Sequence, residues 1–375
     1  MLQQLKSKIR GHAVNARGWR TSRKIVVIES DDWGAIRLPA ARLLEKFNEW
    51  GIKTEKDPML RNDSLASAED LMRLFETIQG IPVKDKPVIT ANTIVANPDF
   101  KKIESEDFQS YYYQPFTETL QNYSSHEGVF DLWKKGMEEG LFHSQFHGRE
   151  HLHVSRWMKG LQDRSSETSR LFHERVYAVC GSASTETKKS YLAAYEWDSD
   201  EDREFTKTSI REGLELFESI FGYKSRSAIA PNYTWHPELE KIYSDGGVKY
   251  LQGGTVQRSP DIDAGKNIPI RHFTGEKNDI GQWYLVRNCR FEPTLDPGTD
   301  NISQCMNQIK TAFLWRKPAI IESHRVNYIG YINPQNRDNN LKLLDTLLRK
   351  IVKTWPDVEF MTSDRLGELM DYNVL

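Results

Sequence analysis

The sequence predicts an α/β fold, specifically a distorted (β/α)7-type barrel with parallel strands, inserted loops and a hairpin. Short apolar runs rich in β-branched residues alternate with segments of helical periodicity about seven times along the chain. This rhythm favours parallel strands with right-handed crossovers, and either a barrel or an open sheet would fit it. No internal repeat or Pro/Ser-rich linker divides the chain. We therefore expect one domain over residues 24–375, preceded by a basic arm or helix at residues 1–23.

Composition excludes several classes of protein. The formal net charge of -2 comes from balanced basic and acidic residues, so we expect no nucleic-acid partner. No apolar run approaches the roughly 20 residues of a membrane span, and the N-terminus lacks the apolar stretch of a signal peptide. The three cysteines are widely spaced, which favours reduced thiols over disulfides or a thiolate zinc site. These features together predict a cytoplasmic protein.

Each expected element follows from its local pattern. The strands are apolar runs that end at polar, Gly or Pro residues: 24–33, 86–97, 140–147, 227–235, 248–251, 317–324 and 358–361. The helices have apolar residues three and four positions apart: 38–50, 67–75, 132–137, 156–161, 208–221, 236–244, 302–315, 341–352 and 364–370. Insertions are expected near 100–125, 162–205 and 265–295, the last as a hairpin of 268–273 with 283–291.

Two adjacent carboxylates end the first strand. Asp31 and Asp32 follow the apolar run Ile25 to Ile28, and Gly34 then breaks the strand. Neighbouring side chains of a strand point to opposite faces, and like charges this close resist joint ionisation. Such a pair indicates a bound cation or a reaction, with a solvated turn as the alternative.

Histidines cluster after the third strand. Four of the ten histidines fall within eleven residues, at His143, His147, His151 and His153. An HxxxH spacing places two imidazoles where they can share a cation, and both His143/His147 and His147/His151 have it. We prefer His147 and His151, because a loop after the strand can turn the second ring back toward a metal. His153 is then exposed or lies beyond the ligands.

Two other strands end in residues that suit chemistry. His324 ends the sixth strand and could be a core residue, a ligand or a general acid. Pro231 fixes a loop whose Asn232 and Tyr233 N–H groups would point into a site, with an ordinary Pro turn as the alternative. In α/β barrels the carboxyl ends of the strands converge on one mouth. Two histidines and a carboxylate there would make an open metal site with a place for water.

The order of these motifs resembles the polysaccharide deacetylase family, the NodB-homology carbohydrate esterases of the glycoside hydrolase/deacetylase barrel superfamily. The resemblance spans roughly residues 24–366 and comprises an Asp-Asp pair, an HxxxH motif, a Pro loop and a strand ending in His. It implies that Asp31 is the general base and that His324 is the general acid. It also implies that the three metal ligands are Asp32, His147 and His151. We also expect substrate or oxyanion contacts from Trp33, Pro231, Asn232 and Tyr233.

The sequence departs from the family pattern at two motifs. Its first motif is Glu-Ser-Asp-Asp where the family has Thr-Phe-Asp-Asp. Its loop Ile229-Ala-Pro-Asn-Tyr233 lacks the Arg that steadies the base in the family. Arg226 or Arg325 is expected to take that place.

These observations predict a metal-dependent hydrolase that removes an acetyl group from an acetylated sugar or polysaccharide intermediate. Zinc suits the ligand set best, and iron, cobalt or nickel would also fit. A sugar-binding protein without turnover on the same barrel is one alternative. A hydrolase of another amide or of a glycosidic bond is the other, although a glycosidase needs a separated pair of carboxylates.

Overall fold

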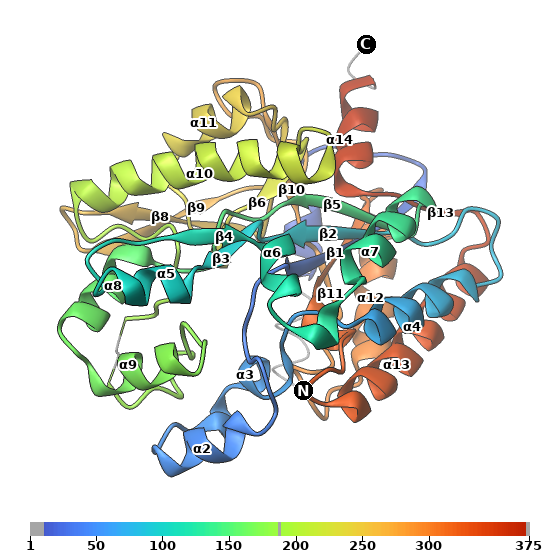
Figure 1. Cartoon of the computed structure of the whole chain (residues 1–375). Helices are drawn as coiled ribbons and strands as arrows, with labels where there is room; N and C mark the ends of the chain where they lie inside the picture. Colours follow the sequence, from blue (N-terminus) through green and yellow to red (C-terminus); the bar gives the residue numbers. More distant parts are fainter. Residues whose placement is uncertain (1–10, 187–188, 373–375) are drawn as a thin grey trace.

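Parallel strands form the centre of the molecule and helices surround them (Figure 1). The computed structural model describes residues 11–186 and 189–372. All neighbours in the main sheet pair in parallel. Its strands are β1 (Lys24–Trp33), β2 (Ile89–Thr93), β5 (Phe142–Phe146), β6 (Ser227–Ile229), β7 (Tyr250–Gly253), β10 (Trp283–Val286), β11 (Cys289–Arg290), β12 (Ala319–His324) and β13 (Val358–Phe360).

The sheet closes through one interrupted strand. Its order is β10-β7-β6-β5-β2-β1-β12-β11, and only Arg287 and Asn288 separate β10 from β11 along the chain. The Arg287 N–H donates to Gly253 of β7 at 2.9 Å, whereas the Asn288 N–H donates to Ile320 of β12 at 3.1 Å. The segment therefore changes partner at this point, and the two edges of the sheet meet as a barrel.

The first strand shows which side chains fill the barrel. Alternate residues of a strand share a face. Ile25 and Val27 belong to an apolar cluster with residues from strands that do not neighbour β1 in the sheet, namely Tyr250, Trp283 and Leu285. These contacts place the odd-numbered side chains of β1 inside the barrel. Glu29 and Asp31 continue that inward row toward the carboxyl end of the strand.

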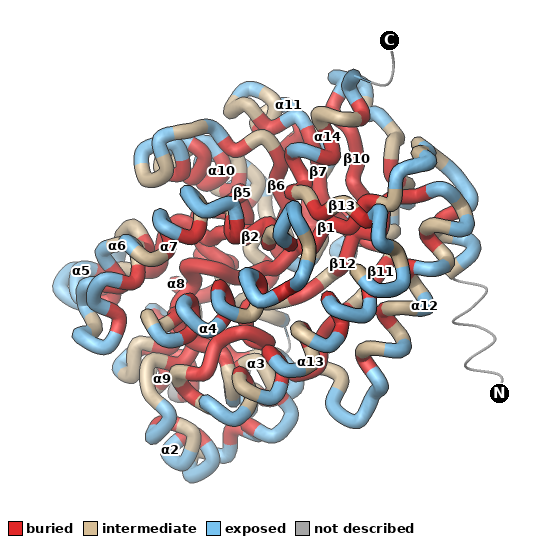
Figure 2. Tube along the Cα trace, turned by 90° about the vertical axis from the view of Figure 1, so that its right-hand side faces the viewer, coloured by how far each residue is buried: buried red, intermediate tan, exposed pale blue. Residues whose placement is uncertain are grey.

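Amphipathic helices cover the barrel. In Figure 2 the strands lie in the middle of the molecule and are coloured mostly as buried. The helices are α4 (Ala68–Gln79), α5 (Phe100–Ser105), α6 (Phe116–Gln121), α7 (Val129–Glu138), α8 (Val154–Gln162), α10 (Asp200–Phe221), α11 (Leu239–Asp245), α12 (Asn301–Leu314), α13 (Pro334–Thr354) and α14 (Ser363–Tyr372). No helix within 11–186 or 189–372 has the length and apolar character needed to cross a bilayer.

A small lobe stands at one end of the molecule. It contains α2 (Leu43–Glu49), α3 (Pro58–Asn62) and α9 (Ser166–His173), which lie together in Figures 1 and 2. Its apolar cluster joins residues 38–60 to residues 171–183. The lobe thus links the chain that leaves β1 to the chain that follows α8.

The predicted fold class is confirmed, because the sheet is parallel and the strands and helices alternate. The predicted hairpin partner is wrong. β9 (Lys266–Arg271) pairs with β8 (Val256–Asp261), and residues 283–290 are the strand that closes the barrel. A strand's pattern shows which residues are extended but does not show their partner. Residues 11–15 of the expected N-terminal arm are helical, and its residues 1–10 lie outside the described residues.

A buried ion pair ties the lobe to the barrel and yields a stability prediction. Arg325 is fully buried, and its Nε and Nη2 donate to the Asp63 carboxylate at 2.8 and 3.2 Å. Asp63→Ala leaves that guanidinium without its counter-charge, so we expect the free energy of unfolding to fall by about 3–5 kcal/mol. Urea unfolding measures the loss. Glu359→Ala, which breaks the exposed pair with Arg23, should cost no more than about 1 kcal/mol. Equal losses would contradict this account.

Candidate active site

A cavity of about 290 Å³ lies at the carboxyl ends of the barrel strands. Its floor carries Asp31 and Asp32 from β1, His147 and His151 after β5, and His324 from β12. Its rim includes residues from the lobe, from the loop after β6 and from β8: Arg37, Asp57, Met59, Leu60, Ala178, Cys180, Leu192, Ala230, Asn232, Tyr233, Arg258 and Leu295. The structure therefore brings the predicted carboxylates and histidines to one mouth.

A twist of the backbone lets both carboxylates face this cavity. Asp32 has φ of 72°, in the left-handed region, and the pairing of β1 with β2 shifts register between Ser30 and Trp33. In a regular strand the Asp32 side chain would point to the opposite face from that of Asp31. The irregularity overcomes that alternation at a conformational cost, which is the kind of strain that clusters at functional sites.

Asp32, His147 and His151 fit a metal ion. The Nε2 atoms of His147 and His151 lie 3.4 and 3.6 Å from Asp32 Oδ1, and all three side chains are buried. Asp32 Oδ1 has no hydrogen-bond partner among the described residues. The three donor atoms lie within 4.8 Å of one another, and a buried polar atom without a partner is costly unless something binds it.

The surroundings aim the two imidazoles. His147 Nδ1 lies 2.9 Å from the Ile229 carbonyl oxygen; donation there leaves Nε2 free as a ligand atom. Arg149 and Glu150, between the histidines, form a buried pair at 2.7 Å. Glu150 also accepts a hydrogen bond from Ser209 of α10 at 3.0 Å. The loop is thus fixed to a long helix on the outside of the barrel.

The other two histidines lie elsewhere, which resolves the choice between the HxxxH pairs. His143 stacks on Tyr223, and its Nε2 lies 3.5 Å from Asp364. His153 caps α8, because its Nδ1 accepts the Arg156 N–H at 3.4 Å.

His153 also belongs to a second group of possible ligands, with Asp198 and Asp202. Because its Nδ1 is an acceptor, the proton of the neutral ring is on Nε2, which then cannot ligate. Asp198 is already paired with Arg156 and Lys189. This group does not suit a metal.

Asp31 is held as an ionised carboxylate. The two terminal nitrogens of Arg287 donate to its oxygens at 2.7 and 2.6 Å, and Asn92 Nδ2 donates at 2.7 Å. Burial raises the pKa of this carboxyl, but Arg287 outweighs burial and holds the pKa below its usual range. Asp31 is therefore ionised at neutral pH.

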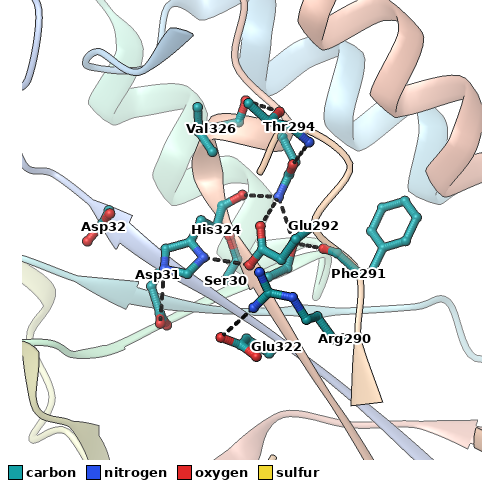
Figure 3. Close-up of polar contacts among 12 residues, drawn as sticks. Ser30, Asp31, Asp32, Arg290, Phe291, Glu292, Thr294, Glu322, His324 and Val326 are labelled. Atoms are coloured by element: carbon teal, nitrogen blue, oxygen red, sulfur yellow. Dashed lines mark hydrogen bonds and ion pairs between the residues drawn. The ribbon is translucent and has the colours of Figure 1, made fainter. Parts of the chain in front are cut away.

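His324 is held in the opposite state. Figure 3 shows its ring between Asp31 and Glu292. Its Nδ1 lies 2.5 Å from Glu292 Oε1, and its Nε2 lies 3.9 Å from Asp31 Oδ2. Burial lowers the pKa of His324, but Glu292 and the nearby Asp31 and Asp32 outweigh burial and raise the pKa to about 10. Both ring nitrogens of His324 are therefore protonated at neutral pH, and the ring is positively charged.

The predicted loop after β6 reaches the cavity but not in the expected way. Asn232 and Tyr233 line the cavity in left-handed conformations, and Pro231 is buried behind them. The Tyr233 N–H donates to the Ala230 carbonyl at 3.1 Å, so the expected oxyanion contact from that group is wrong. The Tyr233 hydroxyl instead accepts from Arg287 and donates to Glu322, each at 3.0 Å.

Trp33 does not reach the cavity. Its side chain is buried, its Nε1 donates to Ser30 at 2.9 Å, and its ring packs edge-on against Trp133 and Phe142. The expectation that Trp33 contacts substrate is wrong, because Trp33 follows the twist at Asp32 and returns to the core.

Sequence reasoning missed three polar residues of the site. Arg287 takes the place of the absent loop arginine, whereas Arg226 pairs with Glu368 and Arg325 with Asp63. Asn92 and Glu292 are the other two residues. Asn92 and Arg287 each lie at the end of a barrel strand, where site residues are expected. The sequence indicated this position for Asn92. At Arg287 it did not, because residues 283–291 were predicted to belong to a hairpin and not to the barrel.

Comparison with known proteins yields structural likeness without sequence matches. No family model matches the chain, and no curated protein matches its sequence. Its structure is similar to a candidate polysaccharide deacetylase from Mycobacterium smegmatis, with a TM-score of 0.48 and 10% identity over 96% of this chain and 94% of that one. It is also similar to PuuE allantoinase, with a TM-score of 0.43 and 9% identity over 93% and 91% of the chains. A third is the α-amylase AmyC from Thermotoga maritima, with a TM-score of 0.45 and 9% identity over 93% and 74%.

The ligand geometry predicts how metal content responds to mutation. We expect the purified protein to contain close to one divalent metal ion per chain, and His147→Ala to lose it because two ligands hold such ions poorly. Elemental analysis measures the ratio. His143→Ala is the matched control and should retain the metal. Metal lost with His143 but kept with His147 would contradict this ligand set.

The contact between Glu292 and His324 predicts the pH at which the His324 ring loses its positive charge. Below a pH of about 10 the His324 ring should stay protonated, and above it the charge is lost. Glu292→Gln removes the charge that contributes most to the raised pKa of His324. The effect of burial then dominates, so the pKa of His324 should fall by at least about 2. NMR titration of the histidine ring measures both values. An unchanged His324 titration in the variant would show that Glu292 does not hold the proton.

Proposed function

We propose that this protein is a metal-dependent hydrolase that removes an acetyl group from an acetylated sugar or polysaccharide intermediate. One observation carries the proposal. A single cavity contains an ionised carboxylate, Asp31, a protonated imidazole, His324, and a separate set of metal ligands. Hydrolysis of an amide or ester needs these three functions together.

The metal site has a defined part in this chemistry. A divalent ion held by Asp32, His147 and His151 would polarise the acyl carbonyl and lower the pKa of water. Asp31 points into the same cavity, but Arg287 and Asn92 take up its oxygens, so it is positioned beside the ligands and not among them. Asp31 therefore accepts the proton of the attacking water.

His324 completes the reaction. Amine and alkoxide leaving groups depart poorly unless they are protonated. The His324 Nε2 atom lies 3.9 Å from Asp31, so acid and base act on the same small volume. Glu292 keeps the proton on His324 until the bond to the leaving nitrogen or oxygen breaks.

The sugar part of the proposal is supported by the motif order, which resembles the polysaccharide deacetylase family, and by the cavity walls. Asn232 contributes a polar side chain to the wall, and apolar surface is present at Met59, Leu60 and Leu192. Polar groups within a mostly apolar wall are typical of small-molecule sites.

The alternatives lose support from the same geometry. The absent loop arginine favoured a sugar-binding protein without turnover, but Arg287 occupies the required position at Asp31. A glycosidase needs two carboxylates on either side of a bond. Here Asp31 and Asp32 are adjacent in the chain, and Asp32 belongs to the ligand set.

Removal of the acid or the base should abolish most turnover. We expect Asp31→Asn and His324→Gln each to lower kcat for acetate release by about 10²–10⁴-fold, because general acid–base catalysis is worth that much. Released acetate is measured with zinc-loaded protein on a panel of N- and O-acetylated sugars. His143→Gln, a histidine outside the cavity, should retain wild-type activity.

Two results would contradict the proposed function. One is the absence of acetate release by metal-loaded wild-type protein across the panel. The other is wild-type turnover in both the Asp31→Asn and the His324→Gln variants.

A further inference from the structure

Most charged side chains that line the cavity have partners within the described part of the protein. Apart from the histidines, five charged side chains among residues 11–186 and 189–372 line it: Asp31, Asp32, Arg37, Asp57 and Arg258. Asp31 is paired with Arg287, and Asp32 lies 3.4 Å from Arg37. Asp57 accepts hydrogen bonds from the Leu60 and Cys180 N–H groups, each at 2.9 Å.

Arg258 is the exception. Its guanidinium makes no hydrogen bond or ion pair with any residue in 11–186 or 189–372, and the side chain is exposed at the rim of the cavity. The other arginine of the cavity, Arg37, is buried and lies within 3.7 Å of Asp63 as well as close to Asp32. Arg258 therefore offers a cation to whatever enters, whereas Arg37 does not.

The backbone beneath Arg258 is fixed. Its carbonyl accepts the Trp235 N–H at 3.0 Å, and Arg258 pairs with Pro269 across the β8–β9 hairpin. A bridge to Thr234 ties it to the loop that carries Tyr233. A fixed backbone limits the positions that the side chain can reach, so less freedom is lost when it binds.

Much of the remaining cavity lining is apolar and offers no partner for this cation. The lobe and the chain near it contribute Met59, Leu60, Ala178 and Leu192, and their side chains are apolar. The nearest carboxylate of the lobe in the cavity is Asp57, whose oxygens are taken by backbone N–H groups. Each cavity carboxylate already has partners within the protein, so a bound molecule could supply the counter-charge that Arg258 lacks.

We propose that the substrate carries an acidic group, a carboxylate or a phosphate, on the acetylated sugar or on the unit joined to it, and that Arg258 binds this group. The proposal rests on the proposed function and names its substrate class. Arginine binds both anions through two parallel hydrogen bonds, so it recognises their planar or tetrahedral oxygens better than a lone hydroxyl. The volume of about 290 Å³ is near the lower end of small-molecule sites and suits one sugar unit with its substituents.

Equilibrium binding tests the proposal without turnover. The probes are three matched sugars: N-acetylglucosamine, the uronic acid made from it, and its 6-phosphate. Calorimetry with the zinc-loaded His324→Gln protein, in which turnover is expected to be largely lost, should show tighter binding of at least one acidic sugar than of the neutral one. The sugar that is preferred identifies the anion as carboxylate or phosphate.

Arg258→Gln, added to the same protein, removes the cation and leaves a shorter, neutral polar side chain. The ratio of the dissociation constants for the neutral and the preferred acidic sugar should fall by about 10-fold to 100-fold, as expected for a charged hydrogen bond. Arg271→Gln is the matched control. Arg271 lies on the same hairpin, is exposed and does not line the cavity, so this ratio should not change.

Three results would overturn the proposal. They are equal affinity of the His324→Gln protein for neutral and acidic sugars, the same loss for all three sugars when Arg258→Gln is added, and an equal change of the ratio when Arg271→Gln is added. Acetate release is scored separately, so its failure contradicts the proposed function and leaves the binding result to decide the role of Arg258.

Discussion

The buried guanidinium of Arg287 is the interaction on which the site depends. It donates to Glu29 at 2.6 Å and to both oxygens of Asp31, and all three side chains are almost wholly removed from water. Isolated buried charges are very costly, so each of these groups requires the others. Because Arg287 stands where the closing strand changes partner, the same contacts tie that segment to β1 and orient the base. The Tyr233 hydroxyl extends the network to the loop after β6.

The closing strand also sets the acid. Glu292 follows β11 and holds His324, whereas Arg287 precedes β11 and holds Asp31. One short segment therefore drives the pKa values of two neighbouring groups in opposite directions. Such a separation is how a site keeps a base ionised and an acid protonated at one pH. The ionised base and the protonated acid are therefore an aspartate and a histidine whose pKa values would be ordinary in water.

Local patterns predicted strands and helices well and predicted partners poorly. The apolar runs at β1, β12 and β13 lie close to their expected positions, whereas α10 and α13 begin eight and seven residues before their expected starts at 208 and 341. Residues 283–290 were also correctly expected to be extended, but they pair with β7 and β12 and not with β9. A run of alternating residues can join any sheet edge that offers a matching face, so its sequence does not name the partner.

The sequence by itself determined the parallel α/β architecture and that Asp31, Asp32, His147, His151 and His324 meet in one cavity, because barrel strands deliver their last residues to one mouth. Tertiary structure alone decided which groups support them. Arg287 is more than 250 residues from Asp31 in the chain, and no local pattern connects the two. It also decided that Asp32 turns back toward the histidines while Trp33 returns to the core. That outcome depends on one left-handed residue whose cost only the assembled site can offset.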